Sequence, residues 1–96
     1  MIFSQVMGYI SQDAVSKTTP TSNKEYAFFI VVSKDDKNKD TYVRCYLYGC
    51  SPKRLKTLTT GTKVIVYGEQ NVSLFNKDNG ESDINININV DKLYFI

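Results

Sequence analysis

The sequence predicts an all-β fold, a five-stranded barrel with one short helix between the third and fourth strands. Strand signals dominate the chain, and the clearest is at residues 84–90, where isoleucine or valine alternates with asparagine. A single segment, residues 51–61, changes to helical spacing. With 96 residues the chain has material for one core, so residues 1–96 are expected to form one domain.

The first half of the chain predicts two strands. The first covers residues 2–11, where Gly8 marks a bend or a close backbone approach of the kind that closes a small barrel. Residues 12–24 are rich in Ser and Thr and are expected to form a loop. The second strand covers residues 25–33, and the charged residues 34–40 link it to the next strand. The side chains of the second strand expected in the core are Ala27, Phe29 and Val31.

The third predicted strand, residues 41–49, has one apolar face and one aromatic face. Alternation places Val43, Cys45 and Leu47 on the apolar side. Arginine is rarely buried without a partner, so the face that contains it is expected to be wet. The residues on that face are Tyr42, Arg44, Tyr46 and Tyr48.

A short helix is expected directly after this strand. Ser51 is suited to cap its first turn, Pro52 is suited to the first helical position, and Gly61 is suited to its C-terminal end. A fourth strand over residues 62–69 should lead into a hairpin whose tip lies at residues 76–80.

The fifth strand is expected over residues 83–95. Five strands with a helix between the third and the fourth match the order of an OB-fold, a partly open barrel that binds oligonucleotides.

Composition argues against an enzyme. Histidine is absent, which removes the commonest general base and the commonest metal ligand. The two cysteines lack the spacing of a zinc site and are expected to be reduced thiols. We therefore predict no catalytic residues, no cofactor and no metal site. With no apolar run long enough for a membrane span and no leader, a soluble cytoplasmic protein is expected.

Charge is unevenly distributed along the chain. The net charge is only +2, yet residues 34–63 carry eight of the twelve basic side chains and three of the ten acidic ones. Lysines in turns often serve solubility alone. The clustering nevertheless favours phosphate contacts, and the candidates that follow the third strand are Lys53, Arg54 and Lys56.

The stripe Tyr42, Arg44, Tyr46 and Tyr48 favours nucleobases as its partner, because every base has a face that stacks on an aromatic ring. Phe28 on the neighbouring strand would extend the platform, and Phe75 with Lys77 near the hairpin tip would add to it. Two alternatives stay open. The tyrosines either form cross-strand pairs that stabilise the sheet or form a protein–protein interface.

Several segments resemble the bacterial single-stranded-DNA-binding protein (SSB) family. The third strand, TYVRCYLYG, is similar to the family's third strand, and LTTGTKVIVYG is similar to its helix end, glycine turn and fourth strand. Residues 71–80 resemble its long hairpin, and VMGYI resembles its first strand. The resemblance implies an OB-fold, sequence-tolerant binding of single-stranded DNA, and assembly as homodimers or homotetramers. Its stacking positions would be Tyr42, Tyr48 and Phe75, with Arg44 as the basic residue between the first two.

The sequence departs from the family where its long hairpin begins, because Asn71, Val72, Ser73 and Leu74 stand where arginines are usual. Phosphate contacts would then come from the basic residues after the third strand. The chain ends at Ile96 without the acidic tip that recruits repair and replication enzymes, so we expect no docking tail. Such a barrel suits replication, recombination or a mobile element of phage or plasmid origin.

Three alternative functions remain open on the sequence. RNA binding is a near neighbour, since stacking does not distinguish the two sugars. An OB-fold adaptor would use the tyrosine face for protein contacts. The third is a primosome accessory barrel similar to the primosomal replication protein PriB.

Overall fold

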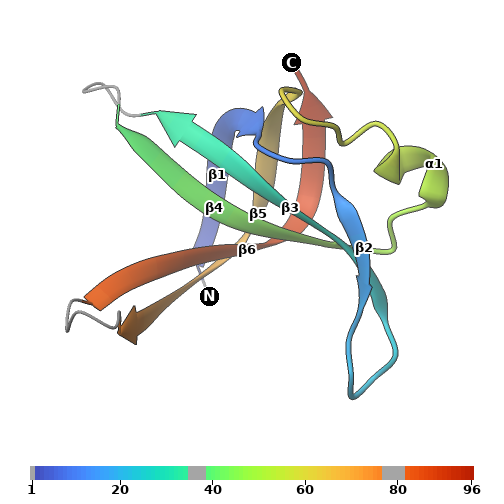
Figure 1. Cartoon of the computed structure of the whole chain (residues 1–96), viewed down its shortest axis with the longest axis horizontal. Coiled ribbons are helices and arrows are strands. Elements are labelled where there is room, and N and C mark those ends of the chain that lie inside the picture. Colours follow the sequence, from blue (N-terminus) through green and yellow to red (C-terminus); the bar gives the residue numbers. More distant parts are fainter. Residues whose placement is uncertain (1, 35–38, 77–81) are drawn as a thin grey trace.

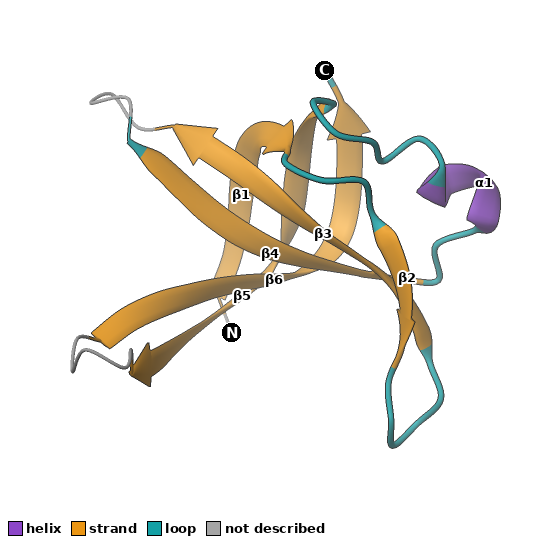
Figure 2. Cartoon of the chain, in the orientation of Figure 1, coloured by secondary structure: helices purple, strands orange, loops and turns teal. Residues whose placement is uncertain are grey.

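A computed structural model of the chain describes residues 2–34, 39–76 and 82–96 (Figure 1). Strands make up most of the described chain and one short helix lies at its side (Figure 2). In chain order the elements are β1 (Ile2–Ile10), β2 (Val15–Thr18), β3 (Glu25–Lys34), β4 (Asp40–Tyr48), α1 (Pro52–Leu55), β5 (Lys63–Asn76) and β6 (Ser82–Phe95).

Five of the strands close into a barrel. The strand order is β1-β5-β6-β4-β3-β2. A further pairing of β1 with β3, at Tyr9–Val32 and Ile10–Val31, closes the barrel and leaves β2 outside it. Every pairing is antiparallel except that of β4 with β6, which is parallel. The predicted five-stranded barrel with one helix between its third and fourth barrel strands is confirmed.

The prediction of a loop over residues 12–24 is wrong in part, because β2 lies within it and pairs with β3 from Val15–Phe28 to Thr18–Glu25. All four β2 side chains are exposed. The segment lacks the apolar alternation that would have predicted a strand. Its backbone ladder to β3 holds it in place instead. β2 and the adjoining part of β3 form an arm that extends below the barrel (Figure 1).

The fourth strand is longer than predicted, since β5 continues past residue 69 to Asn76. Pairing with β6 carries it on, from Val64–Phe95 to Asn76–Ser82, with an irregularity between Tyr67 and Gly68. The far part of these two strands forms a second arm (Figure 1).

The helix begins as predicted and ends earlier. The Ser51 hydroxyl accepts a hydrogen bond from the Arg54 N–H at 3.2 Å, and Pro52 is the first helical residue. The helix ends at Leu55, so the expectation that Gly61 caps it is wrong; Gly61 has a φ of +85° in the turn before β5. Three residues after the helix, Leu58 is completely buried in the core cluster.

The core is the inside of the barrel, and the predicted inner faces of the second and third strands are confirmed. Gly8 also fulfils its expected role, because a Cβ at this position would overlap the carbonyl oxygen of Val32, where β1 meets β3. The buried apolar residues of the core cluster are Ile10, Ala27, Phe29, Val31, Val43, Cys45, Leu47, Leu58, Val64, Val66, Ile88 and Leu93.

A side-chain cap ties the loop after β1 to the turn before β5. The Asp13 carboxylate accepts hydrogen bonds from the Thr60 N–H at 2.8 Å and from its hydroxyl at 2.9 Å. These two bonds favour the charged form and lower the pKa of Asp13 from its ordinary value.

Within the described ranges, no helix has the length and apolar character needed to cross a membrane.

Candidate nucleic-acid interface

The outer face of β4 presents the predicted stripe. Because strand side chains alternate, burial of Val43, Cys45 and Leu47 turns the intervening residues outward. Tyr42 is 60% exposed, Tyr48 is 47% exposed, Arg44 is exposed and Tyr46 is half-buried. The stripe therefore lies on the surface, as predicted.

Aromatic residues of β3 extend the β4 stripe into a cluster. The register places Tyr26 opposite Tyr48 and Phe28 opposite Tyr46. Ring centroids are 5.3 Å apart for Tyr26–Tyr48, 5.7 Å for Tyr26–Tyr46 and 5.4 Å for Phe28–Tyr46, and all three pairs are tilted. We call these four residues, Tyr26, Phe28, Tyr46 and Tyr48, the aromatic cluster. Such pairs stabilise the sheet and also leave a wide π surface for bases.

Alternation along residues 25–33 already places Tyr26 on the same side as Phe28, although only Phe28 was predicted to take part in binding. Lys17 was not predicted, because it lies on β2, within the segment predicted to be a loop. Its ammonium stands 4.5 Å from the centroid of the Phe28 ring. This cation–π contact places a positive charge at the edge of the aromatic cluster.

β4 has β3 on one side and β6 on the other, and a polar hollow borders the stripe on the β6 side. β6 lies directly beside β4, with Asn87 next to Arg44 and Asn89 next to Tyr46. β5 continues the surface, with Asn71 opposite Asn87. The hollow has a volume of about 430 Å³, and its lining residues are Arg44, Tyr46, Tyr48, Asn71, Ser73, Asn85, Asn87 and Asn89. We call Asn71, Asn85, Asn87 and Asn89 the amide row.

The basic residues after β4 stand at one end of the stripe. Lys53 and Arg54 lie on α1, Lys56 is the residue that caps its end, and all three side chains are exposed. Only three residues separate Tyr48 from Pro52, so these charges lie close to one end of β4 (Figure 1). They are not among the residues that line the polar hollow.

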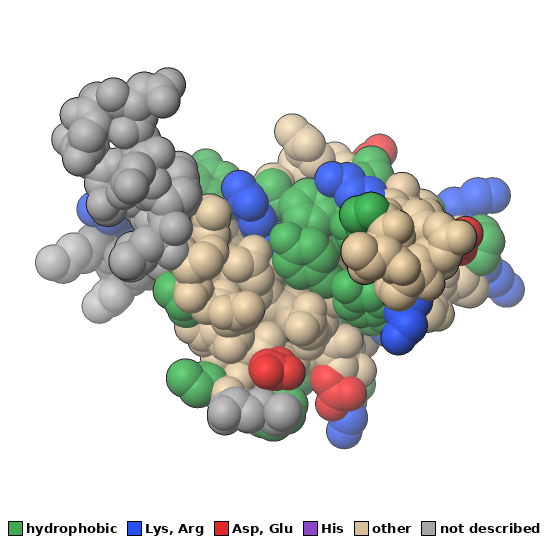
Figure 3. All heavy atoms as spheres, turned by 90° about the horizontal axis from the view of Figure 1, so that it is seen from below, with side chains coloured by type: hydrophobic (Ala, Val, Ile, Leu, Met, Phe, Trp, Pro, Cys, Tyr) green, Lys and Arg blue, Asp and Glu red, His purple; other side chains and the backbone are tan. Residues whose placement is uncertain are grey.

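The view from below shows hydrophobic side chains gathered at the centre of one face (Figure 3). Lysine and arginine side chains lie around them, and acidic side chains are visible at the lower edge and also at the upper edge and the right side (Figure 3). This arrangement is suited to bases at the centre with phosphates around them.

The hairpin candidates are only partly placed. The backbone of Phe75 lies near the end of β5, paired with Asp83, while Lys77 falls outside the described residues. Tyr42 stands apart from the aromatic cluster. It is paired with Val32 of β3, and within the described chain its ring makes no aromatic contact.

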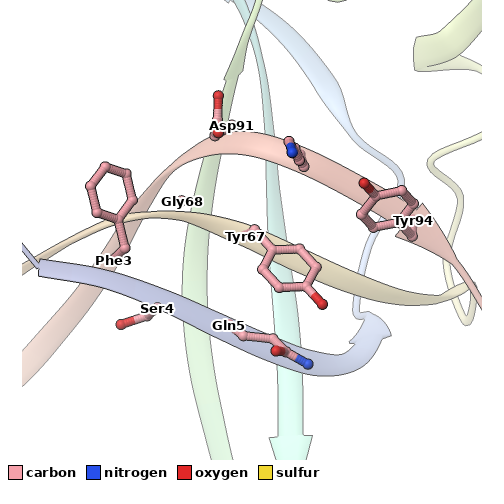
Figure 4. Close-up of a pocket in the computed structure, with 8 residues that line it drawn as sticks. Phe3, Ser4, Gln5, Tyr67, Gly68, Asp91 and Tyr94 are labelled. Atoms are coloured by element: carbon pink, nitrogen blue, oxygen red, sulfur yellow. The ribbon is translucent and has the colours of Figure 1, made fainter.

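A second aromatic surface, not predicted, lies on β1, β5 and β6. Tyr67 and Tyr94 meet edge to face with centroids 5.8 Å apart, and Phe3 lies at the other end of a hollow of about 650 Å³ (Figure 4). Gln5 and Asp91 also line it (Figure 4). This hollow shares no lining residue with the polar hollow beside β4.

The two cysteines are free thiols. Burial raises the pKa of Cys45 to about 12, although a backbone hydrogen bond at Val31 opposes the shift. Partial burial also raises the pKa of Cys50, against the attraction of the Arg54 charge. Neither thiol is activated as a nucleophile, since activation requires a lowered pKa.

Solved structures of known proteins share this fold. A small single-stranded DNA-binding protein from Streptomyces coelicolor superposes with a TM-score of 0.76 at 17% identity, covering 99% of this chain and 94% of that one. A mitochondrial single-stranded DNA binding protein from S. cerevisiae gives 0.71 at 14% identity, with 99% and 94% covered. Plasmodium falciparum SSB, solved with single-stranded DNA, gives 0.69 at 15%, with 100% and 95% covered.

A search of curated protein sequences finds no match. A family model does match, however, and it spans residues 3–96, which is nearly the whole chain and includes every strand of the barrel. The aromatic stripe, the closed barrel and this match agree, and the chain belongs to the single-strand binding protein family.

Proposed function

We propose that the outer face of β3 and β4 is the surface with which this single-strand binding protein holds single-stranded DNA, without reading its sequence. The observation that supports it is a set of rings on one face of a family member, with Tyr42 and Tyr48 exposed and Tyr26, Phe28 and Tyr46 half-buried. Stacking of a base on an aromatic side chain contributes about 1–3 kcal/mol and does not depend on which base it is.

Charges around the rings supply the phosphate contacts in this proposal. Arg44 lies within the stripe, Lys17 lies at the edge of the aromatic cluster, and Lys53, Arg54 and Lys56 stand near one end of β4. Phe75 and Lys77 on the β5–β6 arm are proposed to join them. Attraction at these points is independent of sequence, because it acts on the backbone of the nucleic acid.

The protein acts by binding alone in this proposal, as a cytoplasmic protein that serves replication, recombination or the transfer of mobile DNA in a bacterial host. DNA is the proposed partner. RNA remains a candidate because stacked bases leave the sugar unread unless a side chain contacts the 2′-hydroxyl.

The alternative in which the tyrosines serve the sheet alone rests on the cross-strand ring pairs, which would stabilise the sheet without any ligand. It leaves Tyr42 unexplained, because this ring is 60% exposed and takes no part in those pairs. An OB-fold adaptor would instead present the exposed ring to a protein.

Tyrosine fluorescence separates the two functions, since the chain has seven tyrosines and no tryptophan. Titration with unlabelled oligo-dT should quench this emission and saturate. A matched duplex should compete much more weakly at the same salt concentration, because its bases are already stacked. Absence of quenching, or equal competition by duplex, would contradict single-strand binding through these rings.

We also propose that the protein forms a homodimer or homotetramer. Val32, on the outer side of β3, does not need cover from a second copy, because it is only 2% exposed in the single chain. The large exposed apolar side chains that favour it lie elsewhere. Those on β1 and at the C-terminal end are Ile2, Phe3, Met7, Tyr94, Phe95 and Ile96.

β1 supports this assembly through its backbone as well. It pairs with β5 from Ile2 to Tyr9, whereas its other edge meets β3 only at Tyr9 and Ile10. An open strand edge beside apolar side chains is a template for pairing with a second copy of the chain. Light scattering at high micromolar concentration should give a multiple of 10.9 kDa, and a mass near 10.9 kDa would contradict the proposal.

A further inference from the structure

We infer that the amide row reads the hydrogen-bonding edges of the bases that stack on β4, and so recognises that those bases are unpaired. The inference rests on the proposed function, because it needs a single strand on the β4 stripe. It adds a second source of selectivity for single strands, separate from stacking.

The amide row lies directly beside the β4 stripe. In the parallel pairing of β4 with β6, Asn87 stands beside Arg44 and Asn89 beside Tyr46. Neighbouring strands are about 4.8 Å apart, so the amides begin one strand away from the rings. Tyr46 and Tyr48 line the polar hollow together with the amides, so a base stacked on either ring would have one edge beside the hollow.

The amide groups of the row match the pairing edges of the bases. An asparagine amide offers one acceptor oxygen and two N–H donors side by side. The pairing edge of adenine or cytosine presents an amino donor beside a ring acceptor, and that of thymine or guanine presents a carbonyl beside an N–H. An amide can turn over to match either order. Amides can therefore form hydrogen bonds with any base whose pairing edge is free. This is consistent with a protein that does not select sequence.

The low charge of the polar hollow favours base edges over backbone phosphates as its ligand. The amide row is neutral, and Ser73, the other residue of β5 and β6 that lines the hollow, is neutral as well. Arg44 is the only charged residue that lines the described hollow. A surface built for backbone phosphates would carry more cations at these positions.

Two hydrogen bonds fix the side chain of Asn87 beside the β4 stripe. The Tyr46 hydroxyl donates a hydrogen bond to its Oδ1 at 3.5 Å, and its Nδ2 donates to the Asn71 carbonyl at 3.4 Å. The amide still keeps one N–H and one oxygen lone pair for a ligand. Elsewhere in the row, the side chains of Asn71, Asn85 and Asn89 make no hydrogen bond to another described residue.

Strand selectivity follows from this arrangement. In duplex DNA the pairing edge of each base is already bonded to its partner, so the amide row has nothing to contact. A single strand offers both the face and the edge of each base. The two kinds of contact can be separated by a ligand that keeps the face and blocks the edge.

Thymidine methylated at N3 is such a ligand, because the methyl group removes the N3–H and covers the pairing edge while the ring remains flat. Affinities of the wild-type protein are compared for oligo-dT and for the same oligomer with N3-methylthymidine throughout, by tyrosine fluorescence at one salt concentration. We expect about tenfold weaker binding of the methylated strand, the effect of losing a good two-bond contact.

Variants test whether the amide row is responsible for the discrimination between the two strands. A protein with Asn87→Ala and Asn89→Ala should bind oligo-dT about tenfold more weakly and should no longer distinguish the methylated strand. Gln5→Ala is the matched control, since it removes an amide from the other hollow and should keep the full discrimination. Melting curves check the fold, and Asn89→Ala alone, at an exposed position, replaces the double variant if that one unfolds.

Equal affinity of the wild-type protein for the two strands would overturn the inference, while saturable binding of oligo-dT in the same titration would leave the proposed function standing. Discrimination that persists fully in the double variant would also overturn it, because the edge would then be read elsewhere. Failure of oligo-dT itself to bind would instead reject the proposed function.

Discussion

Tyr26 and Tyr48 lie directly opposite each other on β3 and β4, with their ring centroids 5.3 Å apart. The same ring of Tyr48 is 47% exposed and stands at the edge of the polar hollow. Tyr48 therefore supports the sheet from one side and keeps an exposed face on the other, which the proposed function assigns to base stacking. Tyr42 on the same strand has the exposure without the aromatic partner, and this contrast allows the two roles to be tested separately.

Tyr42→Ala is expected to weaken binding of oligo-dT by about 1–3 kcal/mol while the melting temperature stays near that of the wild type. Tyr48→Ala should weaken binding similarly and also lower the melting temperature, because aromatic pairs contribute about 0.5–1.5 kcal/mol beyond burial. Fluorescence titration and thermal melting of both variants provide the measurement. Tyr42→Phe keeps the ring and serves as control. Normal binding by both alanine variants would favour the adaptor function.

Lys53, Arg54 and Lys56 are expected to set the salt dependence of binding. Replacing all three by glutamine should flatten the plot of log affinity against log salt by about 0.7 for each phosphate that the protein no longer neutralises. The fold should survive, because the Arg54 contribution to the helix cap comes from its backbone N–H.

The control for this prediction replaces Lys63 and Lys92 by glutamine, because these two lysines line other surfaces of the barrel. An unchanged slope in the triple variant, or the same flattening in the control, would show that the phosphates are bound elsewhere.

Gly8→Ala is expected to destabilise the barrel by about 1–3 kcal/mol, the usual cost of forcing extra volume into a packed site. The added Cβ would overlap the Val32 carbonyl oxygen where β1 closes onto β3, so one of these strands must shift. Urea denaturation compares the variant with Gln5→Ala, an exposed position on the same strand. A variant as stable as the wild type would mean that this closure is loose.

Cys45 is expected to resist alkylation at pH 8 in the folded protein and to react once denaturant is added. Burial raises its thiol pKa to about 12, from an ordinary value of 9.0. As pH rises above about 9, the unfolded chain therefore releases this proton first, and the free energy of unfolding falls. Mass spectrometry of iodoacetamide-treated protein provides the measurement, and equal labelling before and after denaturation would contradict the burial.

Features that depend on a local pattern were predictable from the sequence. Alternation over residues 41–49 correctly separates buried Val43 and Cys45 from exposed Tyr42 and Arg44, because side chains of a strand alternate whatever it pairs with. Ser51 and Pro52 fix the start of α1 for the same reason, since a helix cap involves only its own first turn.

Features that depend on which strands meet were decided by the tertiary structure alone. β2 has no apolar pattern and exists through its ladder to β3, which brings Lys17 to Phe28. The polar hollow arises because β4 pairs in parallel with β6, so that Arg44 meets Asn87, far along the chain. Alternation showed that the asparagines of β6 share a wet face. Only the long-range register showed that this face lies beside the tyrosines, because a pattern fixes the side on which a residue lies and not its neighbours on the next strand.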